Sequence, residues 1–470
     1  MKLPADFQNR EAHIYRSVNA LALFSITVVF LSIALYGLVG FRILGNIDVA
    51  IWDFAIIFVL ILWVPWFLVG KGLIYRHLID GMILLIPLLL WVGLEMLRSP
   101  QVVRGFTMFL MLLRGYVIFF VIGTFAFNLK NLRDLNNRIF FCGAFIAALS
   151  LFLYFYNLGS ITGIMRKPFG NTILMVEPTI SGKVPRLIGF SKDPNFYALS
   201  MTLPFLCGQY LKSVGKLVKF VGVIIIGSSI LLTLSRSAII FLCASWVIVS
   251  FILTIFQGAR VGWRYFRVMI SAVVIIAFIV IAVGTNLNLN VVKNIDGRFH
   301  TLSTVKNRLA YIEILSEKLE NPIIGAGLRG SEEVLGRYAH NSYVELLYDT
   351  GIVGFSLWLM FLYATTKRGI TLLRYRADII PWFHAWVFTL FMSTGFSITY
   401  FPLLWIIAAV IWSQPRNFRL EPEPIPPSGL SKQWSPSYFS PSPLNSNLCF
   451  SARDKNPINL VQLKKRNLKP

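Results

Sequence analysis

The chain is poor in charged residues. Asp, Glu, Lys and Arg make up 14% of its 470 residues, whereas a soluble globular domain carries about 25%. Hydrophobic residues make up 56%, and the mean hydropathy is +0.68. This balance excludes an ordinary soluble fold. It predicts an all-α polytopic membrane protein, because a helix satisfies its own backbone polar groups in lipid.

Cysteine is scarce, and no ligand-like clustering is visible. The chain has four cysteines, three in apolar runs (Cys142, Cys207 and Cys243) and one, Cys449, near the C-terminus. No pair has the spacing of a disulfide framework or a metal site. No cluster of His, Cys or carboxylates has metal-ligand spacing either. We therefore expect no metal and no cofactor.

The net charge is +23, but the basic residues are dispersed between apolar runs instead of gathering on one domain. A nucleic-acid partner is therefore not expected. In a membrane protein such an excess reflects loop orientation and contact with the anionic headgroups of a lipid bilayer.

Apolar runs of the length that crosses a membrane, about 20 residues, recur along the chain. The first is too long for a cleaved signal peptide and lacks a small-x-small site, so it is taken as a retained span. Twelve spans are predicted, the sixth and twelfth short: 18–41, 49–69, 79–97, 106–127, 139–158, 196–211, 217–234, 238–256, 268–285, 343–366, 379–397 and 400–412.

The distribution of Lys and Arg predicts the orientation. With the N-terminus in the cytoplasm, the inside segments hold eighteen Lys and Arg and the short outside segments hold four, as the positive-inside bias requires. The domains are then a cytoplasmic N-terminus (1–17), a transmembrane domain (18–412) with two long periplasmic loops (159–195 and 286–339), and a disordered Pro/Ser-rich cytoplasmic tail (413–470).

The segment 304–354 is the most polar ordered part of the chain. A helix capped by Ser303 or Thr304 carries an apolar side and stops at Asn321-Pro322. Gly325 and Gly327 then allow either a tight turn or a close approach to a ligand. We expect amphipathic helices in this loop, lying on the membrane surface. The apolar side consists of Val305, Leu309, Ile312, Leu315 and Leu319.

Three arginines of the outer segments are candidate ligands for an anion. Arg236 lies between two apolar runs and either snorkels into headgroups or holds a phosphate oxygen. Arg186 precedes the Asp193-Pro194-Asn195 turn, where Asn195 can cap the next helix and aim backbone N–H groups at an anion. Arg308 is either a solvated face residue or a bidentate diphosphate clamp.

His340 begins the tenth span and is followed by Asn341. It is either an interfacial hydrogen-bonding residue or a base that takes a proton from an acceptor hydroxyl. Glu345 and Asp349 lie one and two turns further on, where they can orient the ring, pair with an arginine or only solvate the helix. Arg114 is the cation deep in a span, and we expect it to pair with a carbonyl or an acid.

Taken together, these motifs resemble the O-antigen ligase/polymerase superfamily. The order is Arg186-x-x-Gly and Asp-Pro-Asn before one span, Ser-Arg236-Ser after the next, and Arg308, Asn-Pro and Gly-x-Gly in the large outer loop. His340-Asn341 then precedes Gly351-x-x-Gly by nine residues. The resemblance extends over about Ile188 to Phe361.

The resemblance implies a GT-C-like membrane glycosyltransferase of the bacterial inner membrane. It would move a glycan from undecaprenyl diphosphate to a hydroxyl of a glycan or lipid A core acceptor, with no metal. Arg236 and Arg308 match the diphosphate-binding arginines, Arg186 matches less closely, and His340 matches the base. Asn341, Glu345, Gly325 and Gly327 would support the site. Ligase, polymerase and protein O-glycosylation stay open.

Two other classes remain as alternatives. A solute transporter, such as a bicarbonate-transporter relative, would place polar or broken-helix sites near the bilayer midplane. A scaffold of a polysaccharide export complex would use the arginines only to touch headgroups. The absence of an acidic DxD-like motif from both outer loops agrees with a lipid-diphosphate donor.

Overall fold

The protein is described from a computed structural model. It covers residues 5–35, 40–43, 47–68, 76–129, 132–159, 165–166, 172–173, 176–177, 186–191, 193–211, 214–286 and 303–415. Some side chains within these ranges, including that of Arg308, lie outside the description. The chain divides into two units, Met1–Pro427 and Ser428–Pro470, and all the described residues belong to the first.

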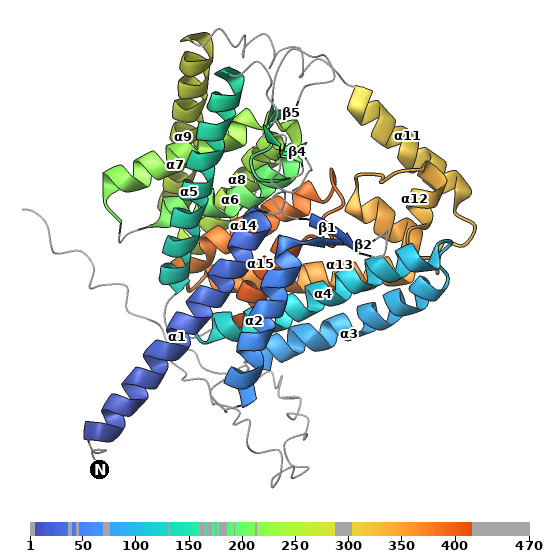
Figure 1. Ribbon diagram of the computed structural model, residues 1–470, viewed down its shortest axis with the longest axis horizontal. Coiled ribbons are helices and arrows are strands. Elements are labelled where there is room, and N and C mark those ends of the chain that lie inside the picture. The colour runs from blue at the N-terminus through green and yellow to red at the C-terminus, as the bar shows by residue number, and fades with distance from the viewer. Residues whose placement is uncertain are drawn as a thin grey trace, which may run out of the picture. The chain divides into compact units, whose positions relative to one another are not determined.

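Helices make up most of the described chain (Figure 1). They are α1 (Ala5–Ala34), α2 (Ile51–Leu68), α3 (Arg76–Leu97), α4 (Val102–Phe127), α5 (Leu132–Gly159), α6 (Pro194–Tyr210), α7 (Lys216–Leu232), α8 (Arg236–Gln257), α9 (Ala259–Asn286), α11 (Ser303–Lys318), α12 (Gly330–Leu335), α13 (Ser342–Leu373), the 3₁₀ turn η1 (Ala377–Ile379), α14 (Ile380–Met392) and α15 (Pro402–Ser413).

The strands form three short antiparallel pairs: β1 (Gly40–Ile43) with β2 (Ile47–Ala50), β3 (Met165–Arg166) with β4 (Thr172–Ile173), and β5 (Val176–Glu177) with β6 (Arg186–Leu187). The expected all-α architecture is therefore correct for the membrane helices but omits these hairpins. They lie between helices, where the apolar runs are interrupted.

All twelve predicted apolar runs coincide with helices. In the described part of the chain, seven helices are long and apolar enough to cross a membrane: α1 over Ser17–Ala34, α2, α3, α4, α5 over Leu132–Phe155, α8 and α13. The helices α14 and α15 are apolar but shorter. The protein is thus a multi-pass membrane protein, while the count of twelve spans, the GT-C likeness and the orientation stay predictions.

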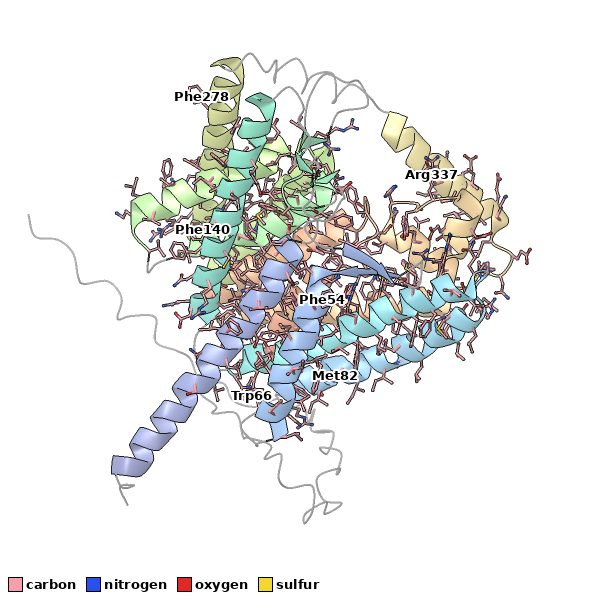
Figure 2. The ribbon with its side chains drawn as sticks, viewed as in Figure 1. Phe54, Trp66, Met82, Phe140, Phe278 and Arg337 are labelled. Atoms are coloured by element: carbon pink, nitrogen blue, oxygen red, sulfur yellow. The ribbon has the colours of Figure 1, made fainter. Side chains whose placement is uncertain are left out.

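The helices pack in two groups joined through α1, α14 and α15. The helices α5–α9 form one group, in which α6 and α8 also pack on α14, and α3, α4, α13 and α15 form the second group (Figure 1). Large apolar side chains point outward as well as inward: Phe278 on α9 is 71% exposed, whereas Phe140 on α5 is fully buried (Figure 2). Outward apolar side chains suit helices surrounded by lipid.

The helix α13 is broken one-third of the way along. Gly351 has φ 65° and ψ −173°, a region that is essentially restricted to glycine. A Cβ atom at this position would lie 2.3 Å from the Ile323 carbonyl oxygen. The break therefore requires glycine both for its backbone angles and for the close approach of the segment that precedes α12.

The segment from Pro322 to Gly327, which precedes α12, forms hydrogen bonds with the backbone groups that the break leaves without helical partners. Ile352 N–H donates to the Pro322 carbonyl (2.9 Å). In the other direction, the Tyr348 carbonyl accepts from Ala326 N–H (2.9 Å) and the Asp349 carbonyl from Gly327 N–H (3.0 Å). Every one of these groups would be costly if left unpaired in a nonpolar environment.

Further bonds fix the same segment to the turn between α3 and α4. Arg98 donates to both Glu95 oxygens (3.0 and 2.7 Å) and to the Gly325 carbonyl (3.0 Å). At Gly327, which has φ 86°, a Cβ atom would lie 2.5 Å from the Arg98 carbonyl oxygen. The loop between α11 and α12 is thereby held against α3, α4 and α13.

The folded part extends past the expected start of the tail at 413. The helix α15 ends at Ser413, and Gln414 is buried, where its carbonyl and side-chain oxygens accept from Arg368 and Arg376 (2.6 Å each). The rest of the predicted tail, from 416, lies outside the described residues, as do 1–4 of the N-terminus and much of both long loops.

Candidate functional site

The N-terminal ends of α6 and α8 meet at a basic group of side chains. Asp193 caps α6, its Oδ1 accepting from Asn195 N–H (2.7 Å). Ser235 caps α8, and its hydroxyl also donates to Asn195 Oδ1 (2.5 Å). Contrary to the prediction, Asn195 does not cap α6, because Asp193 takes that position. Asn195 instead joins the starts of the two helices.

Two arginines, Arg186 and Arg236, lie at the edge of this basic group. Arg186 Nε donates to the Thr233 carbonyl (2.9 Å), three residues before Arg236. Arg236 is the first residue of α8. A cation at a helix N-terminus opposes the positive end of the helix dipole. The start of α8, with Arg236 as its first residue, is therefore a place that an anion would stabilise, whereas the start of α6 already has the Asp193 carboxylate and Arg186 is bonded to the C-cap of α7.

His340 lies at the start of α13 and is exposed. It has φ 55°, a left-handed conformation that is uncommon for residues other than glycine. The next residue, Asn341, caps α13, and its Oδ1 accepts from Tyr343 and Val344 N–H (3.1 and 3.2 Å). The cap and the left-handed turn together set the direction of the imidazole.

Glu345 stabilises the same turn from inside the helix. Its Oε1 accepts from His340 N–H (3.0 Å) and from the Ser397 hydroxyl (2.7 Å). A buried carboxylate is stable only with such donors. The contacts of Glu345 show that its carboxylate holds the His340 backbone, while its expected roles toward the imidazole or an arginine stay predictions.

A line of aromatic rings connects His340 with the basic group. The imidazole lies 6.5 Å from the Phe396 ring, and Phe396 lies 6.4 Å from Phe196, measured between ring centroids. Phe196 directly follows Asn195 in the first turn of α6. His340 and the group that contains Arg186 and Arg236, far apart in sequence, are thus separated by two ring contacts.

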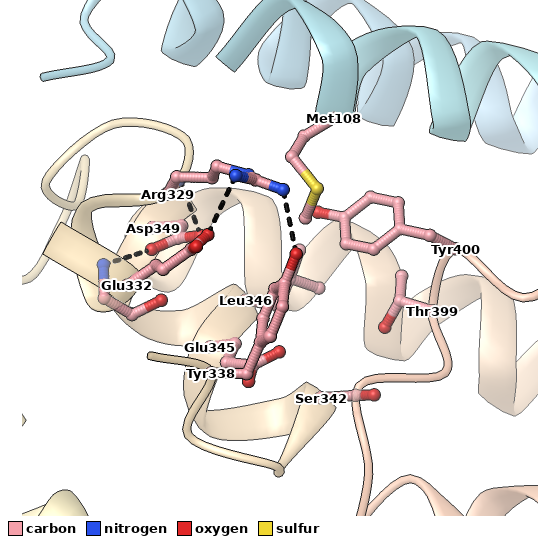
Figure 3. A pocket seen from close by; sticks show the side chains of 11 residues that line it. Met108, Arg329, Glu332, Tyr338, Ser342, Glu345, Leu346, Asp349, Thr399 and Tyr400 are labelled. Carbon is pink, nitrogen blue, oxygen red and sulfur yellow. Dashed lines mark hydrogen bonds and ion pairs between the residues drawn. The ribbon is translucent and has the colours of Figure 1, made fainter. Parts of the chain in front are cut away.

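A pocket lies on the other side of the His340 turn, between α12, α13, α4 and the segment before α15 (Figure 3). Its cavity volume is about 10 Å³, room for about one water molecule. The polar side chains that line it include Arg329, Glu332, Tyr338, Glu345, Asp349 and Thr399. His340, Arg186 and Arg236, which were predicted to catalyse or to bind diphosphate, are not among the described residues that line this pocket.

Arg329 is held in the pocket by its neighbours. Its guanidinium donates to the Tyr338 hydroxyl (2.8 Å) and lies 3.1 Å from Glu332 Oε2 (Figure 3). Burial raises the pKa of Tyr338 above its usual value, so this hydroxyl stays protonated at neutral pH. The cation and the phenol therefore present fixed donors to the cavity.

Asp349 is 4% exposed, and both of its carboxylate oxygens accept hydrogen bonds from backbone N–H groups. Oδ2 accepts from Arg329 N–H (3.0 Å) and Oδ1 from Ser331 N–H (2.8 Å). It thereby caps the short helix α12 from α13, which explains why this carboxylate pairs with no arginine side chain in the described structure. The role of Asp349 seen here is to hold α12 in place.

The remaining predicted residues have mixed outcomes. Arg308 lies in α11, with its side chain outside the description. Gly325 and Gly327 serve the tight turn, because chain atoms occupy the space where a ligand would have to approach. Arg114 pairs with both expected kinds of partner, Asp53 (2.6 Å) and the Tyr400 carbonyl (3.3 Å).

Sequence reasoning missed the pocket residues Arg329, Tyr338 and Thr399. Arg329 stands between Gly327 and Gly330, and an arginine enclosed by glycines in a polar loop is a usable signal. Tyr338 lies two residues before His340 and gives a weaker one. Thr399 is 3% exposed, and no local pattern marks it, because it comes from the loop before α15, far along the chain from the other two.

The fold and this arrangement define a multi-pass membrane protein with polar groups gathered at helix starts. Residues 221–359 match the family model described as O-antigen ligase, which confirms the resemblance predicted from the motifs. The match contains Arg236, Arg308 and His340. No curated protein matches the chain.

At the level of the family, the match supports a membrane glycosyltransferase of the ligase or polymerase type. This family implies lipid-linked glycan donors and polysaccharide acceptors in general.

Proposed function

We propose that the protein transfers a glycan from undecaprenyl diphosphate to an acceptor hydroxyl at the periplasmic face of the bacterial inner membrane, without a metal. The observation that carries the proposal is the basic group at the starts of α6 and α8, two ring contacts from an exposed imidazole. A dianionic leaving group requires fixed positive charge where its own charge develops.

The reaction assigns one role to each group. The His340 imidazole takes the proton of the acceptor hydroxyl, and the oxygen attacks the anomeric carbon of the donor sugar. The bond from this carbon to the diphosphate oxygen breaks, and undecaprenyl diphosphate leaves with the electron pair. Arg236, Arg308 and Arg186 stabilise its charge, and the imidazolium returns its proton to water.

The transporter alternative has one structural feature in its favour, the broken helix α13. In transporters, a break exposes backbone carbonyls and amides to the solute. Here the freed groups on both sides of Gly351 are bonded to the segment from Pro322 to Gly327, and the Thr350 carbonyl accepts from Trp91 Nε1 (2.9 Å). This occupancy favours the transferase over the transporter.

The test uses purified full-length protein in lipid nanodiscs with an undecaprenyl-diphosphate oligosaccharide as donor. Longer chains identify a polymerase, and transfer to added lipid A core identifies a ligase. His340→Asn removes the base while tolerating a left-handed backbone, and we expect the rate to fall by about 10²–10⁴-fold. His340→Ala should fall equally, with a small additional loss of stability.

The control is His77→Asn, which changes a histidine on α3 that contacts Asp80 (3.0 Å) and should leave the rate unchanged. Full activity of His340→Asn would end the assignment of the base. Absence of turnover by the wild type, together with solute uptake by vesicles containing it, would favour the transporter.

A further inference from the structure

The pocket beside His340 has the opposite charge character to the basic group. It contains three carboxylates, from Glu332, Glu345 and Asp349, and the single guanidinium of Arg329. A diphosphate would find a single cation here, and Arg329 is already paired with Glu332. A neutral sugar suits the pocket better, because its hydroxyl groups both donate to carboxyl groups and accept from guanidinium and phenol groups.

The pocket also contains polar atoms that the protein leaves unsatisfied. Thr399 is 3% exposed, and its hydroxyl has no hydrogen-bond partner among the described residues. The Nε atom of Arg329 is also buried and has no hydrogen-bond partner among the described residues. In Figure 3 the Thr399 hydroxyl points away from the Tyr400 ring, toward the side of the pocket where Glu345 and Ser342 lie. Buried polar atoms without partners are unfavourable, so a hydroxyl group placed here would be stabilised.

The size of the cavity restricts what enters it. A volume of about 10 Å³ admits one group of about the size of water, such as a hydroxyl or the end of a hydroxymethyl arm, and excludes a sugar ring. Tyr338 is 39% exposed, so its ring offers an apolar surface next to a polar group. A sugar ring outside the pocket can rest there while one arm reaches inside.

We propose that this pocket binds one non-reacting hydroxyl arm of the acceptor sugar and so orients the acceptor toward His340. The proposal rests on the glycosyl transfer proposed above. Glu345 connects the pocket to the His340 backbone, and Phe396 connects the imidazole toward the basic group. Acceptor and donor thus reach the base from two directions, each through a site of suitable charge.

The decisive variant is Thr399→Val, which is nearly isosteric and breaks no hydrogen bond seen in the structure. Initial rates are measured in nanodiscs with the undecaprenyl-diphosphate oligosaccharide as donor and the free oligosaccharide released from it as acceptor. We expect the acceptor KM to rise about 5- to 10-fold, as loss of one hydrogen bond predicts. The donor KM, the kcat and the melting temperature should stay unchanged.

The matched control is Ser25→Ala on α1, which removes another fully buried hydroxyl without a partner among the described residues. It should change neither KM. A second variant, Tyr338→Phe, removes the hydroxyl that accepts from Arg329 and should also raise the acceptor KM alone.

A set of monodeoxy acceptors separates ligand contact from structure. One of them should lose as much affinity for the wild type as Thr399→Val loses for the full acceptor, with no further loss when the two are combined. An unchanged acceptor KM in Thr399→Val would show that the pocket holds only water and would overturn this proposal. Failure of the wild type to transfer glycan would instead overturn the proposed function.

Discussion

The basic group and the pocket both form at helix starts, but they use their polar side chains differently. At α8 the cap is the neutral hydroxyl of Ser235, and Arg236 adds positive charge to a helix end whose first turn holds no acidic residue, whereas α6 beside it is capped by the Asp193 carboxylate. At α12, Asp349 supplies the compensating negative charge.

The comparison shows how one fold separates binding of an anion from positioning of a neutral group. Where the dipoles are reinforced, a ligand must supply the negative charge. Where a buried carboxylate compensates the helix start, the local structure is complete, and only small polar gaps such as that beside Thr399 remain.

The pocket depends on the break in α13. The substitution Gly351→Ala should therefore disrupt both the break and the pocket. The added Cβ would lie 2.3 Å from the Ile323 carbonyl oxygen. We expect a loss of about 4 kcal/mol or more, since backbone strain and a steric clash combine. Thermal unfolding in detergent measures the loss.

Gly336→Ala is the matched control for this break. Gly336 has φ 67°, but nothing lies within 4 Å of its Cβ position, so its loss should be about 1 kcal/mol. Equal melting temperatures of the two variants would contradict the description of the break.

Asp349→Ala should remove the carboxylate that caps the start of α12. Two buried N–H groups, those of Arg329 and Ser331, would lose their acceptor, which should lower the free energy of unfolding by about 3 kcal/mol. Asp349→Asn keeps one accepting oxygen and should lose about half of that. The half-exposed Asp80 offers a control, because Asp80→Ala should change the melting temperature little.

Arg236→Gln should weaken the anion side alone. We expect the donor KM to rise about 10- to 100-fold, the value of a charge-assisted hydrogen bond, with an unchanged acceptor KM. Raised salt should weaken donor binding of the wild type more than acceptor binding. A rise in the acceptor KM of similar size would mean that the two regions do not divide the substrates.

Asp193→Ala should have the smallest effect, about 1 kcal/mol of stability, as expected for an N-cap. Its Oδ1 accepts from Asn195 N–H, which in turn orders the contact with Ser235. Asp193→Ser should restore most of the stability, because serine also caps. A melting temperature of Asp193→Ala identical to the wild type would show that Asn195 and Ser235 hold the helix start alone.

Much of the fold was predictable because hydrophobicity is a local property. Each of the twelve predicted apolar runs overlaps a helix, but the helix predicted to stop at Asn321-Pro322 already ends at Lys318. The hairpins and the assignment of the α6 cap to Asp193 were not predicted, because several polar residues in one turn compete for the same N–H group, and only the final backbone angles select the winner.

Composition and motif spacing are sufficient to predict a helical membrane protein with the motif order of the O-antigen ligases, because neither depends on contacts between distant residues. Three pairings emerge only from the folded chain: Glu345 holds the His340 backbone, Asp349 caps α12, and Thr399 joins Arg329 in one pocket. These pairings depend on the break at Gly351 and on packing between distant segments, which no local pattern specifies.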